Sequence, residues 1–231
     1  MGIFSVLLLT AAPAGMGAET GGASVKIDGR EALLRSVELF LNRDNVKQVQ
    51  IVFLPEEIEE AKRKHGGHFG FSGVKVVSGG PRWMDQLIAG GAKLEPTATH
   101  VLVHDAARPA VSYVDIEAIM EAADQHAVVS LVTPCRGTLV EVDEGGGAMA
   151  FQSPTRFMQI LTPQVFTNAK FIEMVAARQE PHASQFTLLK GSALNIRLGG
   201  SGDAALGRAM IAMLPKPKAK PLSSPFEEAQ W

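Results

Sequence analysis

The chain has 231 residues, of which 46% are hydrophobic and 20% are charged, and its formal net charge is −2. This is the composition of a globular protein long enough to bury a core, and the near-neutral charge excludes the strong basic field of a nucleic-acid-binding protein, so we expect no nucleic-acid partner. The single cysteine, Cys135, excludes an internal disulfide framework. One cysteine fits a reducing compartment, and we therefore expect a cytoplasmic protein.

The N-terminal segment has two interpretations. Residues 1–17 read MGIFSVLLLTAAPAGMG, an apolar run followed by small residues, which resembles a secretory signal peptide. A signal peptide also carries a positive segment, and no Lys or Arg precedes Lys26. The apolar part is too short to span a bilayer, so we expect no membrane partner. We favour a buried first strand over residues 3–10.

Short apolar runs alternate with helical patterns as far as residue 132. Several runs are continuous and rich in Val, as expected of parallel strands that are covered on both faces. Strands are predicted at 3–10, 49–54, 74–77, 101–104 and 128–132. Helices are predicted at 30–41, at 55–64 with an end near Gly66-Gly67, at 82–88, and at 112–126 with Ser112 as N-cap. This alternation predicts an α/β fold with a mainly parallel sheet and right-handed crossovers.

The pattern changes after residue 132. Segments 138–142 and 148–152 alternate around Glu144-Gly145-Gly146-Gly147, which predicts an antiparallel hairpin, a β-arm over about 138–153. A helix at 168–179, a strand at 194–198 and a helix at 203–213 follow. Residues 215–231 are rich in Pro and Lys and are predicted to be disordered. We therefore expect one domain over 1–214.

Ligands of open α/β sheets bind beyond the carboxyl ends of the strands, so two segments are candidates for a site. The first strand leads into a loop of small residues, 11–17, and then into Gly21-Gly22. Small residues let backbone N–H groups approach a phosphate, although the same composition is typical of a mobile surface loop.

The fourth strand ends in a second candidate segment, residues 104–109. Here Asp105 is followed by two alanines and by Arg108. A carboxylate at a strand end suits magnesium, which proteins hold through one or two carboxylates together with substrate phosphates. An Asp105–Arg108 ion pair that only orders the loop is the alternative.

Five short segments together indicate a resemblance to a known family. They are GGPR at 79–82, VHDAARP at 103–109, PCRGT at 134–138, LTPQVF at 161–166 and NIR at 195–197. In this order they resemble the motifs of the methylerythritol-phosphate cytidylyltransferases, the CTP-using enzymes of the non-mevalonate isoprenoid pathway. The resemblance covers about residues 3–213.

The resemblance implies a Rossmann-like nucleotidyltransferase fold with a protruding β-arm that completes a homodimer. It implies transfer of CMP from CTP to a sugar-alcohol phosphate, methylerythritol phosphate, with Mg²⁺ as cofactor. The implied roles are catalysis for Arg197 and Asp105, metal binding for Asp105, nucleotide binding for Ala11, Ala12, Gly15, Gly17, Gly80, Arg82 and Ala106, and acceptor binding for Arg108 and Thr138.

The glycine-rich loop departs from the family pattern. Gly15 stands where the family has Arg, and Gly21-Gly22 stand where it has Pro-Lys, while Lys26 follows nearby. Loss of one donor to a transition state typically costs roughly 10²–10³ in rate, so two lost cations cost on the order of 10⁴. Two alternatives therefore stay open: a weak or inactive homologue that binds a nucleotide or partner, and a nucleotidyltransferase for another sugar phosphate.

Overall fold

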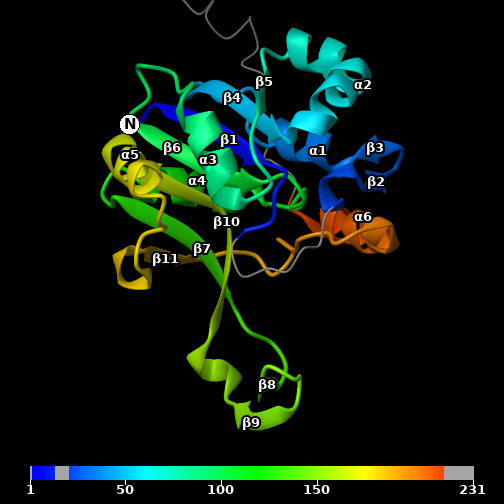
Figure 1. Ribbon diagram of the computed structural model, residues 1–231, viewed down its shortest axis with the longest axis vertical. Coiled ribbons are helices and arrows are strands. Elements are labelled where there is room, and N and C mark those ends of the chain that lie inside the picture. Colours follow the sequence, from blue (N-terminus) through cyan, green and yellow to red (C-terminus); the bar gives the residue numbers. More distant parts are fainter. Residues whose placement is uncertain (1, 14–20, 216–231) are drawn as a thin grey trace, which may run out of the picture.

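The central sheet takes its strands from both halves of the chain (Figure 1). The structure is a computed structural model, and it describes residues 2–13 and 21–215. The strands are β1 Phe4–Leu9, β2 Lys26–Ile27, β3 Arg30–Glu31, β4 Val46–Phe53, β5 Lys75–Ser78, β6 His100–Asp105, β7 Val128–Pro134, β8 Leu139–Val142, β9 Ala148–Gln152, β10 Met158–Thr167 and β11 Thr187–Lys190. The α-helices are α1 Ala32–Glu38, α2 Ile58–Phe71, α3 Trp83–Gly91, α4 Tyr113–Ala122, α5 Asn168–Ala177 and α6 Ala204–Met213.

The seven-stranded sheet has the order β11-β7-β10-β6-β1-β4-β5. β1 pairs in parallel with β4 and β6, β4 with β5, and β7 with β11, whereas β10 runs antiparallel between β6 and β7. The predicted mainly parallel sheet is confirmed. The buried first strand is confirmed as well, because β1 lies inside the sheet and all of its residues are buried.

Alternate side chains of β1 enter two hydrophobic cores on opposite faces of the sheet, as the two-residue period of a strand requires. Phe4, Val6 and Leu8 pack with apolar side chains of α1, α2 and α4. Leu7 and Leu9 pack with those of α3 and α5. Figure 1 shows α3 and α5 in front of the sheet. Helices therefore cover both faces of the sheet.

The end of the sheet beyond β7 differs from the prediction. Residues 194–198, predicted as a strand, are irregular, and the parallel neighbour of β7 is β11. The backbone of this segment bonds elsewhere, because the N–H of Leu198 donates to the carbonyl of Ala107. The side-chain amide of Asn195 donates to the carbonyl of Thr162. The segment is therefore held against the loop after β6 and the middle of β10.

Helix α2 extends to Phe71, beyond its predicted end near Gly66-Gly67. The glycines lie on open surface, while His65 and Phe69 on the same helix are buried. Each glycine costs a helix about 1 kcal/mol relative to alanine, and the buried face offsets that cost. The N-cap prediction for α4 is confirmed, because the Ser112 hydroxyl accepts the N–H of Asp115.

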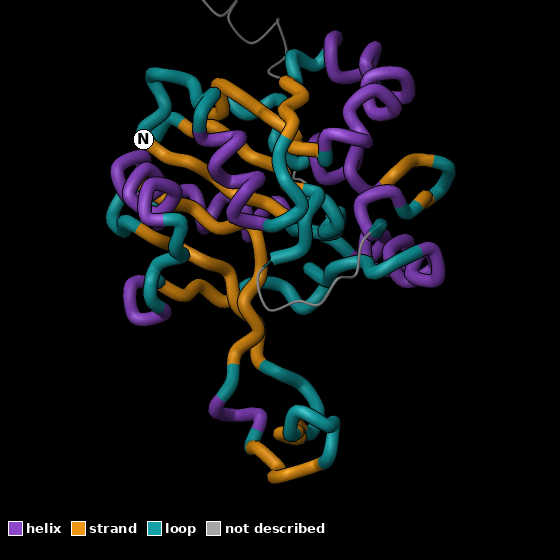
Figure 2. Tube along the Cα trace, in the orientation of Figure 1, coloured by secondary structure: helices purple, strands orange, loops and turns teal. Residues whose placement is uncertain are grey.

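The predicted β-arm is confirmed as the hairpin of β8 and β9. In its turn, the Asp143 carboxylate accepts the N–H groups of Gly145 and Gly147, and Gly146 has a positive φ of 82°. Figure 2 shows β7 and β10 as a narrow stem that carries this hairpin away from the body of the molecule. The arm therefore exposes its side chains on several sides.

Within residues 2–13 and 21–215, no helix combines the length and the apolar character that crossing a membrane requires. The tail predicted to be disordered, 215–231, lies outside the described residues except for Pro215.

Candidate functional site

A cavity of about 1200 Å³ opens at the carboxyl ends of β1, β4 and β5. The residues that line it come mainly from the ends of these strands and the segments after them, from α1 and α3, and from the segment after α5. They are Thr10, Ala11, Ala12, Pro13, Gly21, Ala23, Ser24, Leu33, Phe53, Leu54, Glu57, Pro81, Arg82, Trp83, Met84, Asp85, Arg178, Gln179 and Glu180. The position agrees with the rule that predicted the site, and the volume suits a nucleotide-sized ligand.

Three residues predicted to bind the nucleotide, Ala11, Ala12 and Arg82, line this cavity. Gly80 is not among the lining residues, but a Cβ atom placed on it would lie 2.9 Å from the Cβ of Asp85 in the cavity wall. Gly15 and Gly17 lie outside the described residues.

Arg82 and Asp85 form a two-pronged ion pair at the rim of the cavity. Nε and Nη2 of Arg82 donate to the two carboxylate oxygens of Asp85 at 2.9 and 3.0 Å. These hydrogen bonds lower the pKa of the Asp85 carboxyl, so that it is ionised near neutral pH. The pair places one positive and one negative group at the rim, whereas Trp83 and Met84 supply apolar surface next to it.

The wall formed by Thr10 and Ala11 is held by Gln86 of α3. The Oε1 atom of Gln86 accepts the N–H of Thr10 at 2.9 Å and the N–H of Ala11 at 3.1 Å. The Ala11 N–H is therefore already bonded within the protein. Ala11 can bound the ligand by shape and closeness, but its N–H is not available to a phosphate in this arrangement.

Asp105, Arg108 and Arg197 form a second, buried group at the end of β6. Nε of Arg197 donates to Oδ2 of Asp105 at 2.9 Å, and Nε of Arg108 lies 3.6 Å from the same oxygen. The three side chains are at most 5% exposed. Oδ1 of Asp105 accepts the N–H of Ala107 at 2.9 Å. The structure thus brings together three of the predicted site residues, although none of them lines the large cavity.

Burial opposes ionisation of these side chains, and the opposite charges within the group stabilise one another. Burial raises the pKa of the Asp105 carboxyl, and the Arg197 guanidinium opposes that shift. Burial also lowers the pKa of Arg108. Two guanidiniums beside one carboxylate leave a net positive charge when all three are ionised. Such a group can attract an anionic substrate that reaches it.

His104 connects this group to β10, and its protonation state follows from its partners. Its Nε2 atom lies 3.1 Å from the Arg108 carbonyl, which can only accept, so Nε2 carries the proton. Burial lowers the pKa of His104 to about 3, so the ring is neutral and Nδ1 accepts the hydroxyl proton of Thr162 at 3.1 Å. The Thr162 oxygen in turn accepts the N–H of Asp105.

The loop at 195–198 completes this network and approaches the glycine-rich segment. Nη1 of Arg108 donates to the Asn195 carbonyl at 2.8 Å. A Cβ atom on Gly22 would lie 1.8 Å from the carbonyl oxygen of Leu198, so no side chain fits at position 22 without movement of the backbone. The absence of a lysine there is therefore a requirement of this packing.

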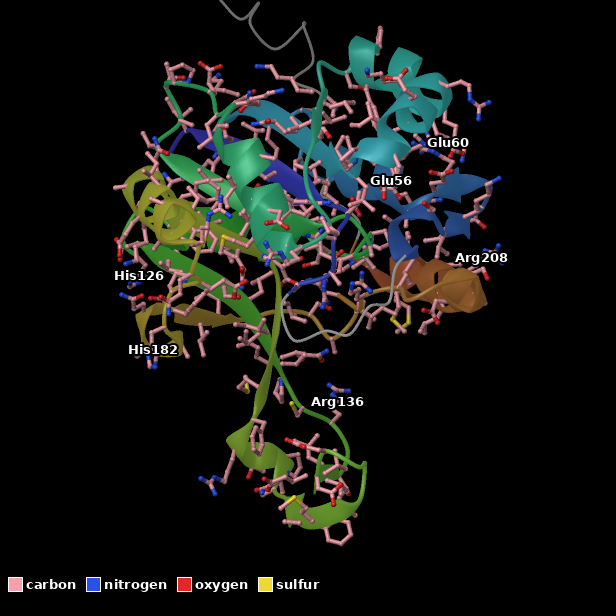
Figure 3. All side chains as sticks on the ribbon, viewed as in Figure 1. Glu56, Glu60, His126, Arg136, His182 and Arg208 are labelled. Atoms are coloured by element: carbon pink, nitrogen blue, oxygen red, sulfur yellow. The ribbon has the colours of Figure 1, made fainter. Side chains whose placement is uncertain are left out.

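Two other residues that were predicted for the site, Ala106 and Thr138, do not line the cavity. Ala106 is buried; its N–H donates to the Leu9 carbonyl and its own carbonyl accepts the Ser36 hydroxyl. Thr138 is exposed at the start of the arm and is not a lining residue of the cavity. Figure 3 labels Arg136 on the segment that leads from the body into the arm. The PCRGT motif is thus on the arm side of the molecule.

The described residues do not provide a complete metal site. Residues 2–13 and 21–215 contain no cluster of three or more His, Cys, Asp or Glu side chains that could hold a metal ion. Both oxygens of Asp105 are engaged by protein donors. Asp105 as a magnesium ligand stays a prediction, because protein donors already bond to both of its oxygens and no cluster of metal-ligating side chains among the described residues includes it.

The sequence patterns did not identify Gln86 or the cavity-lining segment 178–180. Gln86 carries a signal that could have identified it, because Trp83, Gln86, Leu87 and Gly90 form the buried face of α3 at helical spacing. A polar residue on such a face needs buried partners. Segment 178–180 carries no comparable signal, because it reaches the cavity only through the packing of α5.

Comparisons with known proteins identify the family of the chain. The family model "2-C-methyl-D-erythritol 4-phosphate cytidylyltransferase" matches residues 5–210. The protein of that name from Clostridioides difficile is 24% identical over 201 residues, 82% of this chain and 85% of the relative. The one from Halalkalibacterium halodurans is 28% identical over 202 residues, 81% of this chain and 87% of the relative.

Among solved structures, the 2-C-methyl-D-erythritol 4-phosphate cytidylyltransferase from Thermus thermophilus matches with a TM-score of 0.70 at 24% identity. The match covers 92% of this chain and 100% of that chain, and it supports the fold. Because the family model spans most of the sequence, the chain belongs to the 2-C-methyl-D-erythritol 4-phosphate cytidylyltransferase family.

Proposed function

We propose that the chain transfers the cytidylyl group of CTP to 2-C-methyl-D-erythritol 4-phosphate and releases pyrophosphate. An oxygen of the acceptor phosphate forms the new bond to the α-phosphorus of CTP, and the bond from that phosphorus to the oxygen bridging to the β-phosphorus breaks. The observation that carries the proposal is the cavity at the carboxyl ends of β1, β4 and β5, lined by Ala11, Ala12 and Arg82, in a chain of this family.

The residues divide between the two substrates. CTP occupies the cavity, where the Arg82–Asp85 pair faces the nucleotide and Ala12 allows close approach of the backbone. The acceptor phosphate binds on the side of Arg108, and Arg197 stabilises negative charge that develops on the phosphates. Preorganised positive groups of this kind are the main source of catalysis in transfers at phosphorus.

Magnesium is part of the proposal, with CTP as its main ligand. When bound, Mg²⁺ would neutralise the triphosphate, and the ion usually keeps several waters in such sites. Mg²⁺ would share the Asp105 carboxylate with the Arg197 guanidinium, which already bonds to one of its oxygens.

We further propose that two copies of the chain associate through their arms. A two-stranded hairpin is only marginally stable alone, and large exposed apolar patches mark interfaces. The exposed apolar side chains of the arm and its stem are Val140, Val142, Met149, Phe151, Phe157, Met158 and Ile160. In a homodimer, Thr138 could then reach the acceptor site of the second copy. We place this dimer in the cytoplasm, because the chain has a single cysteine.

A second candidate function is that of a homologue which binds nucleotide and turns it over slowly. Two observations favour it: no side chain fits at Gly22, and the Asp105 carboxylate is bonded on both oxygens. Transfer to a different sugar phosphate would use the same cavity and chemistry.

Pyrophosphate release from CTP and Mg²⁺, with methylerythritol phosphate as acceptor, tests the proposal. Turnover in the ordinary range of about 1–10³ s⁻¹ supports it. Tight CTP binding in calorimetry with little turnover supports the homologue that binds nucleotide. Turnover only with another acceptor, in a panel of sugar phosphates, supports transfer to a different sugar phosphate. A chain that neither binds CTP nor releases pyrophosphate contradicts all of them.

A further inference from the structure

We infer that Gln86 is a positioning residue of the nucleotide cavity, which fixes the wall at Thr10 and Ala11 against α3. The inference rests on the proposed function for the identity of the ligand, CTP. It goes beyond that function because it assigns a role to a side chain that does not line the cavity.

The contacts of Gln86 join three elements. Its Oε1 atom accepts the N–H groups of Thr10 and Ala11, directly after β1. Its Nε2 atom donates to the hydroxyl of Thr10 at 3.2 Å, and that hydroxyl donates to the Val52 carbonyl of β4 at 2.9 Å. Gln86 itself is fully buried. One amide side chain therefore joins the end of β1 to α3 and, through Thr10, to β4.

This geometry requires a side chain that accepts and donates at once. Two N–H groups point at one oxygen, and the Thr10 hydroxyl, whose proton is used on Val52, needs a donor. An amide supplies both functions, and so does a protonated carboxyl group, but an ionised carboxylate accepts only. An apolar side chain of similar size would leave the buried Ala11 N–H without its partner and the Thr10 N–H with only its bond to the Val52 carbonyl at 3.3 Å, which is costly.

Gln86 affects the ligand through the position of the cavity walls. Thr10 and Ala11 both line the cavity, and Asp85, the neighbour of Gln86 on α3, forms the charged rim with Arg82. By joining these two walls, Gln86 sets the distance between the backbone after β1 and the Arg82–Asp85 pair. If the walls separate, the cavity loses its fit to the nucleotide even though every lining side chain is still present.

Two variants and a matched control test the inference by CTP binding in titration calorimetry. We expect Gln86→Leu to raise the Kd for CTP by about tenfold or more, since the unpaired N–H of Ala11 and the lost link to Thr10 displace the wall. Gln50→Leu removes another fully buried glutamine, one that bonds to the Gly90 and Lys93 carbonyls and does not line the cavity. It should lower stability but change the Kd for CTP by less than about twofold.

The pH profile of Gln86→Glu separates positioning from general packing. Burial at this position raises the pKa of a carboxyl group, so that the protonated form, which can reproduce the bonds of the amide, is populated at pH 5.5. At pH 8 the ionised group cannot donate to Thr10 and places a negative charge beside the cavity. The Kd of this variant relative to wild type should therefore rise at least about fivefold from pH 5.5 to pH 8. A constant ratio, or Gln86→Leu binding CTP as tightly as wild type, overturns the inference.

Amide hydrogen exchange gives a readout that does not need CTP. The Ala11 amide, which is bonded to Gln86, should exchange at least about tenfold faster in Gln86→Leu than in wild type or Gln50→Leu. Unchanged exchange at this amide overturns the inference. A wild-type chain that binds no CTP contradicts the proposed function, and in that case the exchange data alone decide whether Gln86 holds the segment.

Discussion

Nε of Arg197 lies 2.9 Å from Oδ2 of Asp105, and the two residues are 92 positions apart in the chain. The contact joins the end of β6 to the irregular segment at 195–198. It gives a fully buried carboxylate a charged hydrogen-bond partner.

Replacement of Arg197 should therefore affect stability and activity together. Arg197→Met leaves Asp105 with only the more distant Arg108 as a cationic partner, and breaking a buried pair in this way costs about 3–5 kcal/mol. Arg197→Lys keeps the charge and should cost less, although it loses the planar geometry of the guanidinium. Urea unfolding and pyrophosphate release measure the two effects. If Arg197→Met were as stable as wild type, the contact would not exist in solution.

The buried His104 predicts a loss of stability in acid. Its folded-state pKa of about 3 lies below the ordinary value of 6.5, so the unfolded chain takes up the proton first. The contribution of neutral His104 to the free energy of unfolding is complete above about pH 6.5. It is lost as the pH falls toward 3, at about 1.4 kcal/mol per pH unit.

Urea unfolding of wild type and His104→Gln between pH 7.5 and 4 checks this expectation. The glutamine side chain can still donate to the Arg108 carbonyl but does not titrate. The difference in unfolding free energy between the two proteins should shrink or reverse as the pH falls. Parallel curves would show that His104 is not the responsible group.

The close approach at Gly22 predicts that a lysine restored there does not repair the triphosphate loop. Gly22→Lys places its Cβ against the Leu198 carbonyl and should destabilise the fold by about 1–3 kcal/mol or more. Ser24 is exposed and lines the cavity, so Ser24→Lys adds the same charge without this clash. We expect Ser24→Lys to tighten CTP binding by about threefold or more through charge-assisted contacts to phosphate.

Thermal unfolding and CTP titration of both variants provide the check. A Gly22→Lys protein with wild-type stability and tighter CTP binding would mean that the backbone at this position moves readily.

The arm predicts a mutation-sensitive dimer. Phe151 is 81% exposed on β9, and Phe151→Asp should shift the chain from dimer to monomer in sedimentation velocity. Val114→Asp changes an exposed apolar residue of α4 in the body and serves as the control. A wild-type monomer, or a Phe151→Asp dimer as stable as the control, would contradict association through the arm.

Much of the architecture is determined by local patterns in the sequence. The continuous apolar run of β1, the glycine turn of the arm and the Ser112 cap act over a few residues, so each could be predicted without knowledge of the rest. β10 could not, because Pro163 and Gln164 interrupt its apolar pattern and its pairing with both β6 and β7 is long-range.

The site, too, has features that the sequence determines and features that only the tertiary structure decides. The sequence alone determined which segments carry chemical groups, since VHDAARP and NIR are local motifs, and the family resemblance placed Asp105, Arg108 and Arg197 in one site. Only the tertiary structure decided that these three are buried together away from the main cavity, and that Gln86 holds the cavity wall. The physical reason is that burial and hydrogen-bond partners depend on how distant segments pack, and that information is not local in the chain.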